Sequence, residues 1–235
     1  MPIDYSKRPG DPTPEPEPTG PGGGLSLSKV TLTKAAPKVS LTKRGGTGRL
    51  TVHLAWNARP AAAPAGGGGF LSKLRNAAVG SAGGIDLDLG ALYEFSDGSK
   101  GVVQALGNAF RDRSAGDPLV WLDGDDRTGG GGETLYVDLR DPARIKRVLV
   151  FAFIYEGVPN WAAADGVVTL TPSAGQEIEV RLDEHDDRSP MCAIAQIVSD
   201  GREVTVQREV RYVQGGQQQL DEAFGWGMRW RTGRK

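Results

Sequence analysis

Apolar and polar residues alternate along much of this chain, and that period of two is typical of β-strands with one buried face. In residues 50–56 the large apolar side chains all fall on one face of the predicted strand: Leu50, Val52, Leu54 and Trp56. Thr51 and His53 fall on the other face. The simplest interpretation of His53 is therefore a solvated or hydrogen-bonded side chain on the polar side of a strand.

Similar patterns predict a series of short strands. They cover residues 25–29, 32–34, 39–43, 85–95, 102–103, 120–122, 135–139, 145–155, 167–171, 177–182, 191–198 and 204–213. Residues 148–155 are apolar on both faces and are therefore expected in the centre of a sheet. Short strands separated by turn residues predict an all-β fold, a β-sandwich of two mostly antiparallel sheets.

Other segments lack this pattern. Residues 1–24 are rich in proline and glycine and predict a disordered tail, because such a segment has little to bury. We expect the sandwich domain to cover residues 25–230, with a flexible insertion at 57–84 and a basic C-terminal tip at 231–235. One or two short peripheral helices are predicted, at residues 70–79 within the insertion and at residues 217–223.

Composition and charge narrow the possible functions. Gly (34) and Pro (15) together form about a fifth of the 235 residues, which argues against a helical bundle. A formal net charge of −1 gives no global attraction to nucleic acid, so no nucleic-acid partner is expected. A single cysteine, Cys192, excludes an internal disulfide and a zinc site built from several thiolates. The longest apolar run, residues 148–155, is far shorter than the roughly 20 residues that a transmembrane helix needs.

Two acidic segments carry the candidate chemistry. Asp86 and Asp88 alternate with leucines, so both carboxylates leave one face of a strand and repel each other unless a cation lies between them. Residues 123–133 add further oxygen donors beside a run of glycines: Asp123, Asp125, Asp126, Thr128 and Glu133. Hard oxygen ligands on a loose loop suit Ca²⁺, which takes six to eight of them. A solvated acidic turn, neutralised locally by Arg127, remains the alternative from the spacing alone.

Two well-known loop motifs do not fit this segment. An EF-hand that starts at Asp123 would place Arg127, Thr128 and Thr134 at positions that need an oxygen ligand, a glycine and a glutamate. A phosphate-binding loop needs Gly-Lys-Ser/Thr at the start of a helix, whereas this glycine run leads into a strand. A hydrolase with a catalytic metal is also disfavoured, because no plausible nucleophile or general base accompanies the acids.

The order of these motifs resembles the TerD-type tellurium-resistance domain family. The resemblance rests on Asp86-Leu-Asp88, Gly124-Asp-Asp-Arg-Thr-Gly129, Glu133 before Val137-Asp-Leu139, the stretch that ends in Ala55-Trp-Asn57, and Trp226-Gly-Met228. It covers roughly residues 25–230. It implies a β-sandwich that binds calcium between acidic loops, is not an enzyme, and acts in bacterial stress responses that include tellurite tolerance.

The resemblance also implies a ligand set. Asp86 and Asp88 match the strand acids of the family, Asp125, Asp126 and Thr128 match its signature, and Glu133 matches its closing acid. The family usually continues its signature with a run of the type Gly-Asp-Gly-Asp-Asp-Glu, whereas this chain has Gly130-Gly-Gly-Glu133. Fewer carboxylates mean weaker calcium binding, so a single, weakly held ion is one expectation. A scaffold that has lost its metal site and acts through protein contacts is the alternative.

The resemblance finally implies partners and a location. Members act with other proteins of a stress-response assembly near the membrane. We therefore expect a cytoplasmic protein, with peripheral attachment to the membrane left open.

Three further features have ordinary and functional interpretations. Residues 183–187 surround His185 with acids and predict a solvated turn. An auxiliary ion site is the functional alternative. Cys192 lies in an apolar run and is expected to be a buried, inert thiol. The aromatic and basic residues after Trp226 suit a strand end with a charged terminus, or contact with nucleic acid or a membrane surface.

Overall fold

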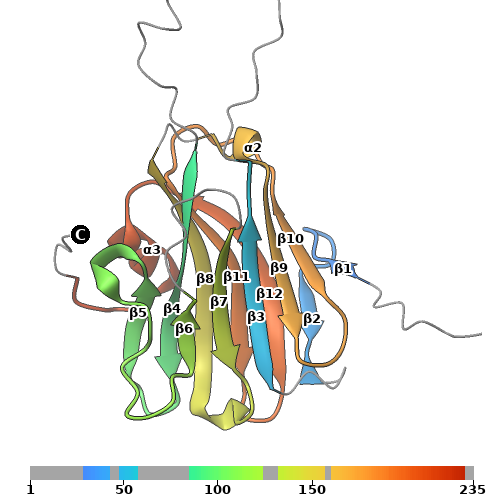
Figure 1. Ribbon diagram of the computed structural model, residues 1–235, viewed down its shortest axis with the longest axis vertical. Coiled ribbons are helices and arrows are strands. Elements are labelled where there is room, and N and C mark those ends of the chain that lie inside the picture. The colour runs from blue at the N-terminus through green and yellow to red at the C-terminus, as the bar shows by residue number, and fades with distance from the viewer. Residues whose placement is uncertain (1–28, 43–47, 58–84, 124–131, 157–159, 231–235) are drawn as a thin grey trace, which may run out of the picture.

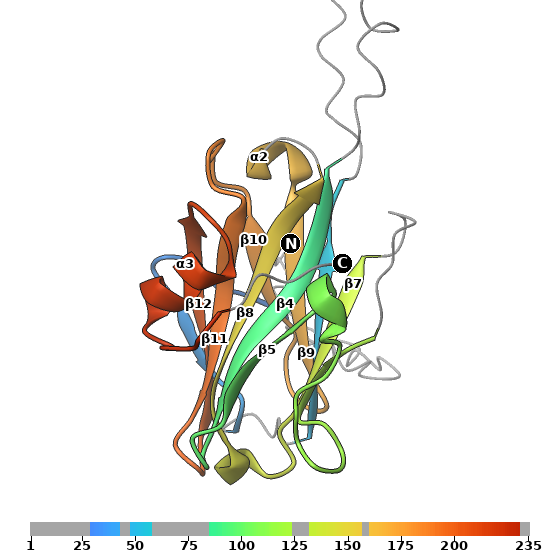
Figure 2. The ribbon, with the colours of Figure 1, turned by 90° about the vertical axis from the view of Figure 1, so that its left-hand side faces the viewer.

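The computed structural model describes residues 29–42, 48–57, 85–123, 132–156 and 160–230. In these residues two sheets pack face to face (Figures 1 and 2). All strand pairs are antiparallel except β1 with β10, which is parallel. The predicted all-β sandwich of two mostly antiparallel sheets is therefore confirmed.

The first sheet has the strand order β1-β10-β9-β3-β7-β6. Its strands are β1 (Val30–Thr31), β3 (Arg49–Ala55), β6 (Val120–Leu122), β7 (Glu133–Asp138), β9 (Gly166–Pro172) and β10 (Ile178–Leu182). In β3 the predicted alternation is confirmed, because Leu50, Val52 and Leu54 are fully buried. His53 lies half-buried on the opposite face, where its Nδ1 is 3.1 Å from Thr134 Oγ1.

The second sheet has the order β2-β12-β11-β8-β4-β5. Its strands are β2 (Lys38–Ser40), β4 (Asp86–Phe95), β5 (Lys100–Gln104), β8 (Ile145–Glu156), β11 (Met191–Ser199) and β12 (Val204–Val213). β8 lies between β11 and β4, which confirms the central position expected from its doubly apolar sequence.

The N-terminal strands differ from the prediction. β1 lies between the predicted strands 25–29 and 32–34, and residues 25–28 lie outside the described residues. β2 ends at Ser40, earlier than the predicted strand 39–43. β1 ends at Thr31, and the backbone amide of Ala36 then donates to Thr33 Oγ1 in a turn. Leu32 is still buried, so the apolar position survives although the predicted strand over residues 32–34 does not form. Side-chain oxygens of threonine favour such turns because they replace a backbone partner.

Helical structure is confined to short elements at the edges of the described sandwich. These are α2 (Trp161–Ala164), α3 (Gln217–Phe224) and the 3₁₀ turns η2 (Leu106–Asn108) and η3 (Pro142–Arg144). α3 confirms the helix predicted at residues 217–223, whereas the pattern gave no sign of α2. The predicted tail at 1–24, most of the insertion at 57–84 with its helix at 70–79, and the tip at 231–235 lie outside the described residues.

Both faces of the second sheet are buried in apolar surroundings. Leu87, Leu89 and Val150 point into the main core between the sheets. On the outer face, Leu92, Leu149, Phe151 and Phe153 belong to a second cluster that includes Leu220 of α3 and Trp226. Figure 2 shows α3 on this outer side, beside β11 and β12.

The chain after α3 is held against the outer face by a dense set of contacts. We call residues 225–230 the C-terminal hook. Trp226 is fully buried, donates from Nε1 to Tyr93 O at 3.1 Å, and lies 3.8 Å under the guanidinium of Arg147. Asp221 of α3, 4% exposed, accepts hydrogen bonds from the amides of Gly227 and Met228 and from Trp230 Nε1.

Glu94 neutralises the cations beneath this hook. The buried carboxylate of Glu94 pairs with Arg147 at 2.6 Å, Lys146 at 2.8 Å and Lys100 at 3.7 Å. Burial raises the pKa of Glu94, but the hydrogen bonds from Lys146 and Arg147 outweigh burial and leave the pKa below its ordinary value. The ionised form of Glu94 therefore stabilises the fold at neutral pH.

Shortening a core valine tests the packing between the sheets. Val150→Ala removes two methyl groups from a site that is 0% exposed, so we expect a loss of about 2 kcal/mol in the free energy of unfolding, measured by urea denaturation. The matched change Val198→Ala, at a side chain 39% exposed, should cost less than about 0.5 kcal/mol. Equal effects at the two valines would contradict this packing.

Removing the Glu94 charge tests its role in acid stability. Glu94→Gln should lower the free energy of unfolding at pH 7 by about 2 kcal/mol. Because the folded-state pKa lies below the ordinary value of 4.5, the difference from the wild type should shrink as pH falls below that value and Glu94 becomes protonated. Urea denaturation at a series of pH values measures it, with Glu222→Gln on the exposed side of α3 as the control. A difference that does not depend on pH would contradict this account.

Candidate functional site

The strand registers bring acidic residues of both sheets to one end of the sandwich. β4 begins at Asp86, which lies opposite Glu156 at the end of β8. β7 begins at Glu133, which lies opposite Leu54 near the end of β3. This is the upper end in Figure 1, where β4 starts and α2 lies.

Glu133 connects the two sheets at this end. Its carboxylate accepts a hydrogen bond from the backbone amide of Leu89, at the edge of β4 beyond the last residue that pairs with β5. Glu133 is 3% exposed, and Asp88, next to Leu89 in the chain, is 2% exposed. Glu133 of the first sheet and Asp88 of the second were both predicted as ligands, and both are buried. The Glu133 carboxylate contacts Leu89, the residue that follows Asp88.

The other predicted ligands stand in different positions. Asp123 is exposed at the end of β6, where its Oδ2 accepts a hydrogen bond from Tyr136 Oη at 3.3 Å. Asp86 is half-buried at the start of β4. Asp125, Asp126 and Thr128 lie outside the described residues. Within the described part of the chain, no three histidine, cysteine or acidic side chains gather closely enough to hold a metal ion.

The last glycine of the predicted loop has a structural role. Gly132 has a φ of +79°, and a Cβ added there would lie 2.3 Å from Leu54 O and 2.9 Å from the His53 ring. A side chain is therefore excluded by both conformation and space. This glycine serves the close approach of the backbone to β3, which the sequence interpretation as an ion-facing loop does not anticipate.

Two features of this end were missed by the sequence interpretation. The pairing of β4 with β8 shifts register between Asp86 and Leu87, which leaves Tyr155 as the extra residue of a β-bulge. Tyr155 is 40% exposed, an unusual exposure for so large a side chain in this chain. Bulges of this kind are frequent next to functional sites, but a run of apolar residues gives no signal for them. Glu156, at the end of the same run, was also not singled out.

The acidic turn around His185 is held by hydrogen bonds of its own and by the ion pairs of Glu184 with Lys34 at 3.0 Å and Arg208 at 3.4 Å. Asp186 accepts hydrogen bonds from the amides of Arg188 and Ser189 and from the Ser189 hydroxyl. Burial raises the pKa of Asp186, but these hydrogen bonds outweigh it and keep the pKa below its ordinary value. The contacts support the interpretation as a turn.

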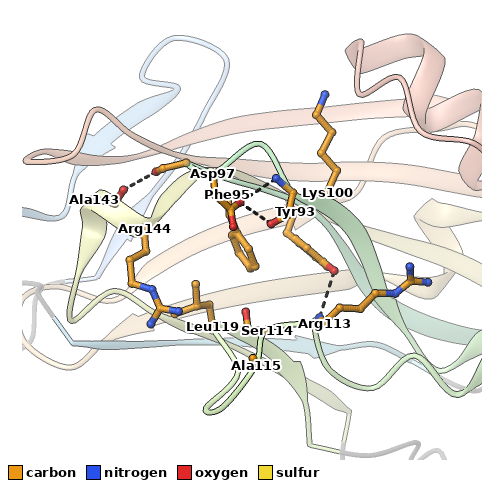
Figure 3. Close-up of a pocket in the computed structure, with 12 residues that line it drawn as sticks. Tyr93, Phe95, Asp97, Lys100, Arg113, Ser114, Ala115, Leu119, Ala143 and Arg144 are labelled. Atoms are coloured by element: carbon orange, nitrogen blue, oxygen red, sulfur yellow. Dashed lines mark hydrogen bonds between the residues drawn. The ribbon is translucent and has the colours of Figure 1, made fainter.

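A cavity of about 680 Å³ lies at the opposite end of β4 from the acidic residues. Figure 3 shows the rings of Tyr93 and Phe95, stacked with centroids 4.6 Å apart, on one side of it. Tyr93 Oη accepts a hydrogen bond from the Arg113 amide, and the Ser99 hydroxyl donates to Asp97. None of the described residues that line it is a histidine or a cysteine, so this cavity offers no pairing of a serine with an imidazole base.

Comparison with known proteins gives one clear relative. Tellurium resistance protein TerA of an Alcaligenes species is 45% identical to this chain over 213 residues, which are 90% of the chain and 60% of TerA. Over nine tenths of its length this chain is therefore similar to a tellurium-resistance protein. The resemblance predicted from the acidic motifs is thereby confirmed.

The similarity covers only part of the relative. The chain spans about three fifths of the length of TerA. No family model matches the chain, and no solved structure matches it. The arrangement of the acidic end therefore comes from the strand registers described above.

The described helices also bear on membrane topology. In the described part of the chain, no helix has the length and apolar character needed to cross a bilayer.

Cys192 is fully buried in β11, and burial raises the pKa of its thiol above the ordinary value. The predicted buried thiol is confirmed. A raised pKa lowers the thiolate fraction, so the folded protein should react with iodoacetamide at pH 8 at least roughly a hundredfold more slowly than the protein unfolded in guanidinium. Mass spectrometry of timed samples measures both rates. Rapid alkylation of the folded chain would contradict the burial of Cys192.

Proposed function

We propose that this chain is a non-enzymatic calcium-binding domain of a bacterial tellurium-resistance and stress-response system. In this proposal an acidic, glycine-rich loop binds Ca²⁺ and presents a surface to a protein partner. The supporting observation is the burial of Glu133 and Asp88 at one strand edge, one carboxylate from each sheet.

The chemistry of these donors fits calcium. Buried carboxylates are costly unless donors or cations compensate for the loss of water. Oxygen ligands of this type are those that Ca²⁺ prefers. Asp88 and Glu133 would hold the ion from the sandwich, with Asp86 and Asp123 beside them and Asp125, Asp126 and Thr128 from the intervening loop.

The proposed ion orders the loop against the sandwich. Asp123 and Gly132 fix the two ends of the loop, the first by the bond from its amide to Thr134 O and the second by its approach to β3. When bound, Ca²⁺ supplies positive charge that draws loop carboxylates toward β4. The loss of acids at Gly130–Gly132 relative to the family pattern favours one weakly bound ion.

The alternative is a scaffold of the same family with a weakened or lost metal site. Within the described residues no cluster of three metal-binding side chains is present, which favours this alternative if the loop contributes nothing. Both versions act through protein partners of a stress-response assembly, in the cytoplasm or at the inner surface of the membrane.

Calcium titration of Asp125→Asn separates the two versions. Under the calcium proposal the wild type binds Ca²⁺ saturably in calorimetry, and Asp125→Asn and Glu133→Gln each raise the Kd at least roughly tenfold, because each removes a ligand charge. The control Asp187→Asn, at a side chain 89% exposed, should leave binding unchanged. At a hundredfold excess of Ca²⁺ over the Kd, linkage adds about 2.7 kcal/mol to the free energy of unfolding.

Thermal melting shows what a calcium titration without binding would mean. A flat titration with no change of Tm between chelator and millimolar Ca²⁺ would overturn the calcium proposal and leave the scaffold. Saturable binding that Asp125→Asn does not weaken would place the ion elsewhere.

A further inference from the structure

A second cavity, of about 800 Å³, lies on the outer side of β5, and its lining includes none of the acidic residues described above. Its walls come from β5, from η2 and the residues after it, from the start of α3 and from the C-terminal hook. Segments more than a hundred residues apart in the chain therefore meet around it. We call it the hook pocket.

The surface of the hook pocket combines apolar and polar groups. Val102, Leu106, Met228 and Trp230 are half-buried and pack against the outer apolar cluster. Beside them, Gln217 Nε2 donates to Gln104 Oε1 at 2.9 Å, which fixes both amides. An apolar surface of this kind suits the body of an organic ligand.

The charged groups of the hook pocket all have one sign. Lys100, Arg113 and Arg229 line it, and none of its described lining residues is acidic. Lys100 is held by Trp226 O at 2.7 Å and by Glu94 at 3.7 Å. Among the described residues, the guanidinium groups of Arg113 and Arg229 have neither a hydrogen-bond nor an ion-pair partner. Figure 3 shows the side chains of Lys100 and Arg113 extending away from the stacked rings of the neighbouring cavity.

The hook pocket is pre-organised. Hydrogen bonds to Asp221 hold the backbone amides of Gly227 and Met228 before Arg229 and the indole of Trp230 after it, and Trp226 anchors the start of the hook in the outer apolar cluster. A binding site whose walls are already fixed loses less conformational entropy when a ligand binds. In a chain of net charge −1, an unpaired pair of arginines on so rigid a wall is a local excess of positive charge.

We propose that the hook pocket binds an organic anion, with its phosphate or carboxylate between Arg113 and Arg229 and its apolar body against Val102, Leu106 and Met228. Guanidinium groups bind both kinds of anion through paired hydrogen bonds. The site is separate from the acidic end, so this inference stands or falls independently of calcium binding.

Fluorescence titration with anilinonaphthalene sulfonate, an aromatic anion, tests the pocket in the full chain. We expect saturable binding of one molecule per chain. The double variant Arg113→Gln/Arg229→Gln should raise the Kd at least roughly tenfold, since two charge-assisted contacts are lost. Arg188→Gln, which removes the same charge from a side chain 81% exposed outside the pocket, is the matched control. Thermal melting checks that each variant is folded.

Competition then identifies the class of anion. Phenyl phosphate and benzoate share an aromatic ring and differ in the charged group. The compound that displaces the probe at the lower concentration carries the preferred group. Displacement by either compound supports the site. Arg229→Glu, which reverses the charge, should weaken binding of the probe more than Arg229→Gln, which only removes it. Binding that is absent, that is unchanged in the double variant, or that neither competitor displaces would overturn the proposal.

Discussion

The second sheet is apolar on both faces, and much of the molecule follows from that constraint. The inner face packs against the first sheet, as in any sandwich. The outer face, with Phe151 and Phe153 at its centre, cannot be left in water, so α3 and Trp226 cover it. The covering segment is short and must be tied down, which explains the concentration of hydrogen bonds on Asp221 and the stacking of Arg147 on Trp226.

β4 separates opposite charges along one strand. Its first residues place Asp86 and Asp88 at the end where Glu133 crosses from the other sheet, and its last residues place Glu94 beneath three cations. A net charge near zero therefore conceals an acidic end and a basic side. The two proposed ligands, a cation and an organic anion, belong to these two regions, and the lining of the hook pocket includes none of the acidic ligands.

The strands were predictable because their burial is periodic. β6 and β12 have the predicted bounds, and β3 has the predicted buried face, since alternation of side chains follows directly from the pleat. The bounds of β1 and the single turn of α2 were not, because both depend on side-chain oxygens that compete locally for backbone amides, those of Thr33 and Asn160. For the candidate site, sequence alone singled out Asp88 and Glu133 as acids. It could not show that Glu133 spans the sheets, because no local pattern encodes a contact between residues 89 and 133. Arg113 escaped notice for the same reason, and Arg229 was noted only as part of the basic C-terminal stretch, since the two line one pocket from distant segments.

Gly132 has one more consequence. A residue that can carry no side chain and that lies against Leu54 O fixes the direction in which the chain enters β7. The register of β3 with β7 therefore does not depend on the length or sequence of the segment before Gly132. The number of acids in that segment can therefore vary without disturbing the strands that support it.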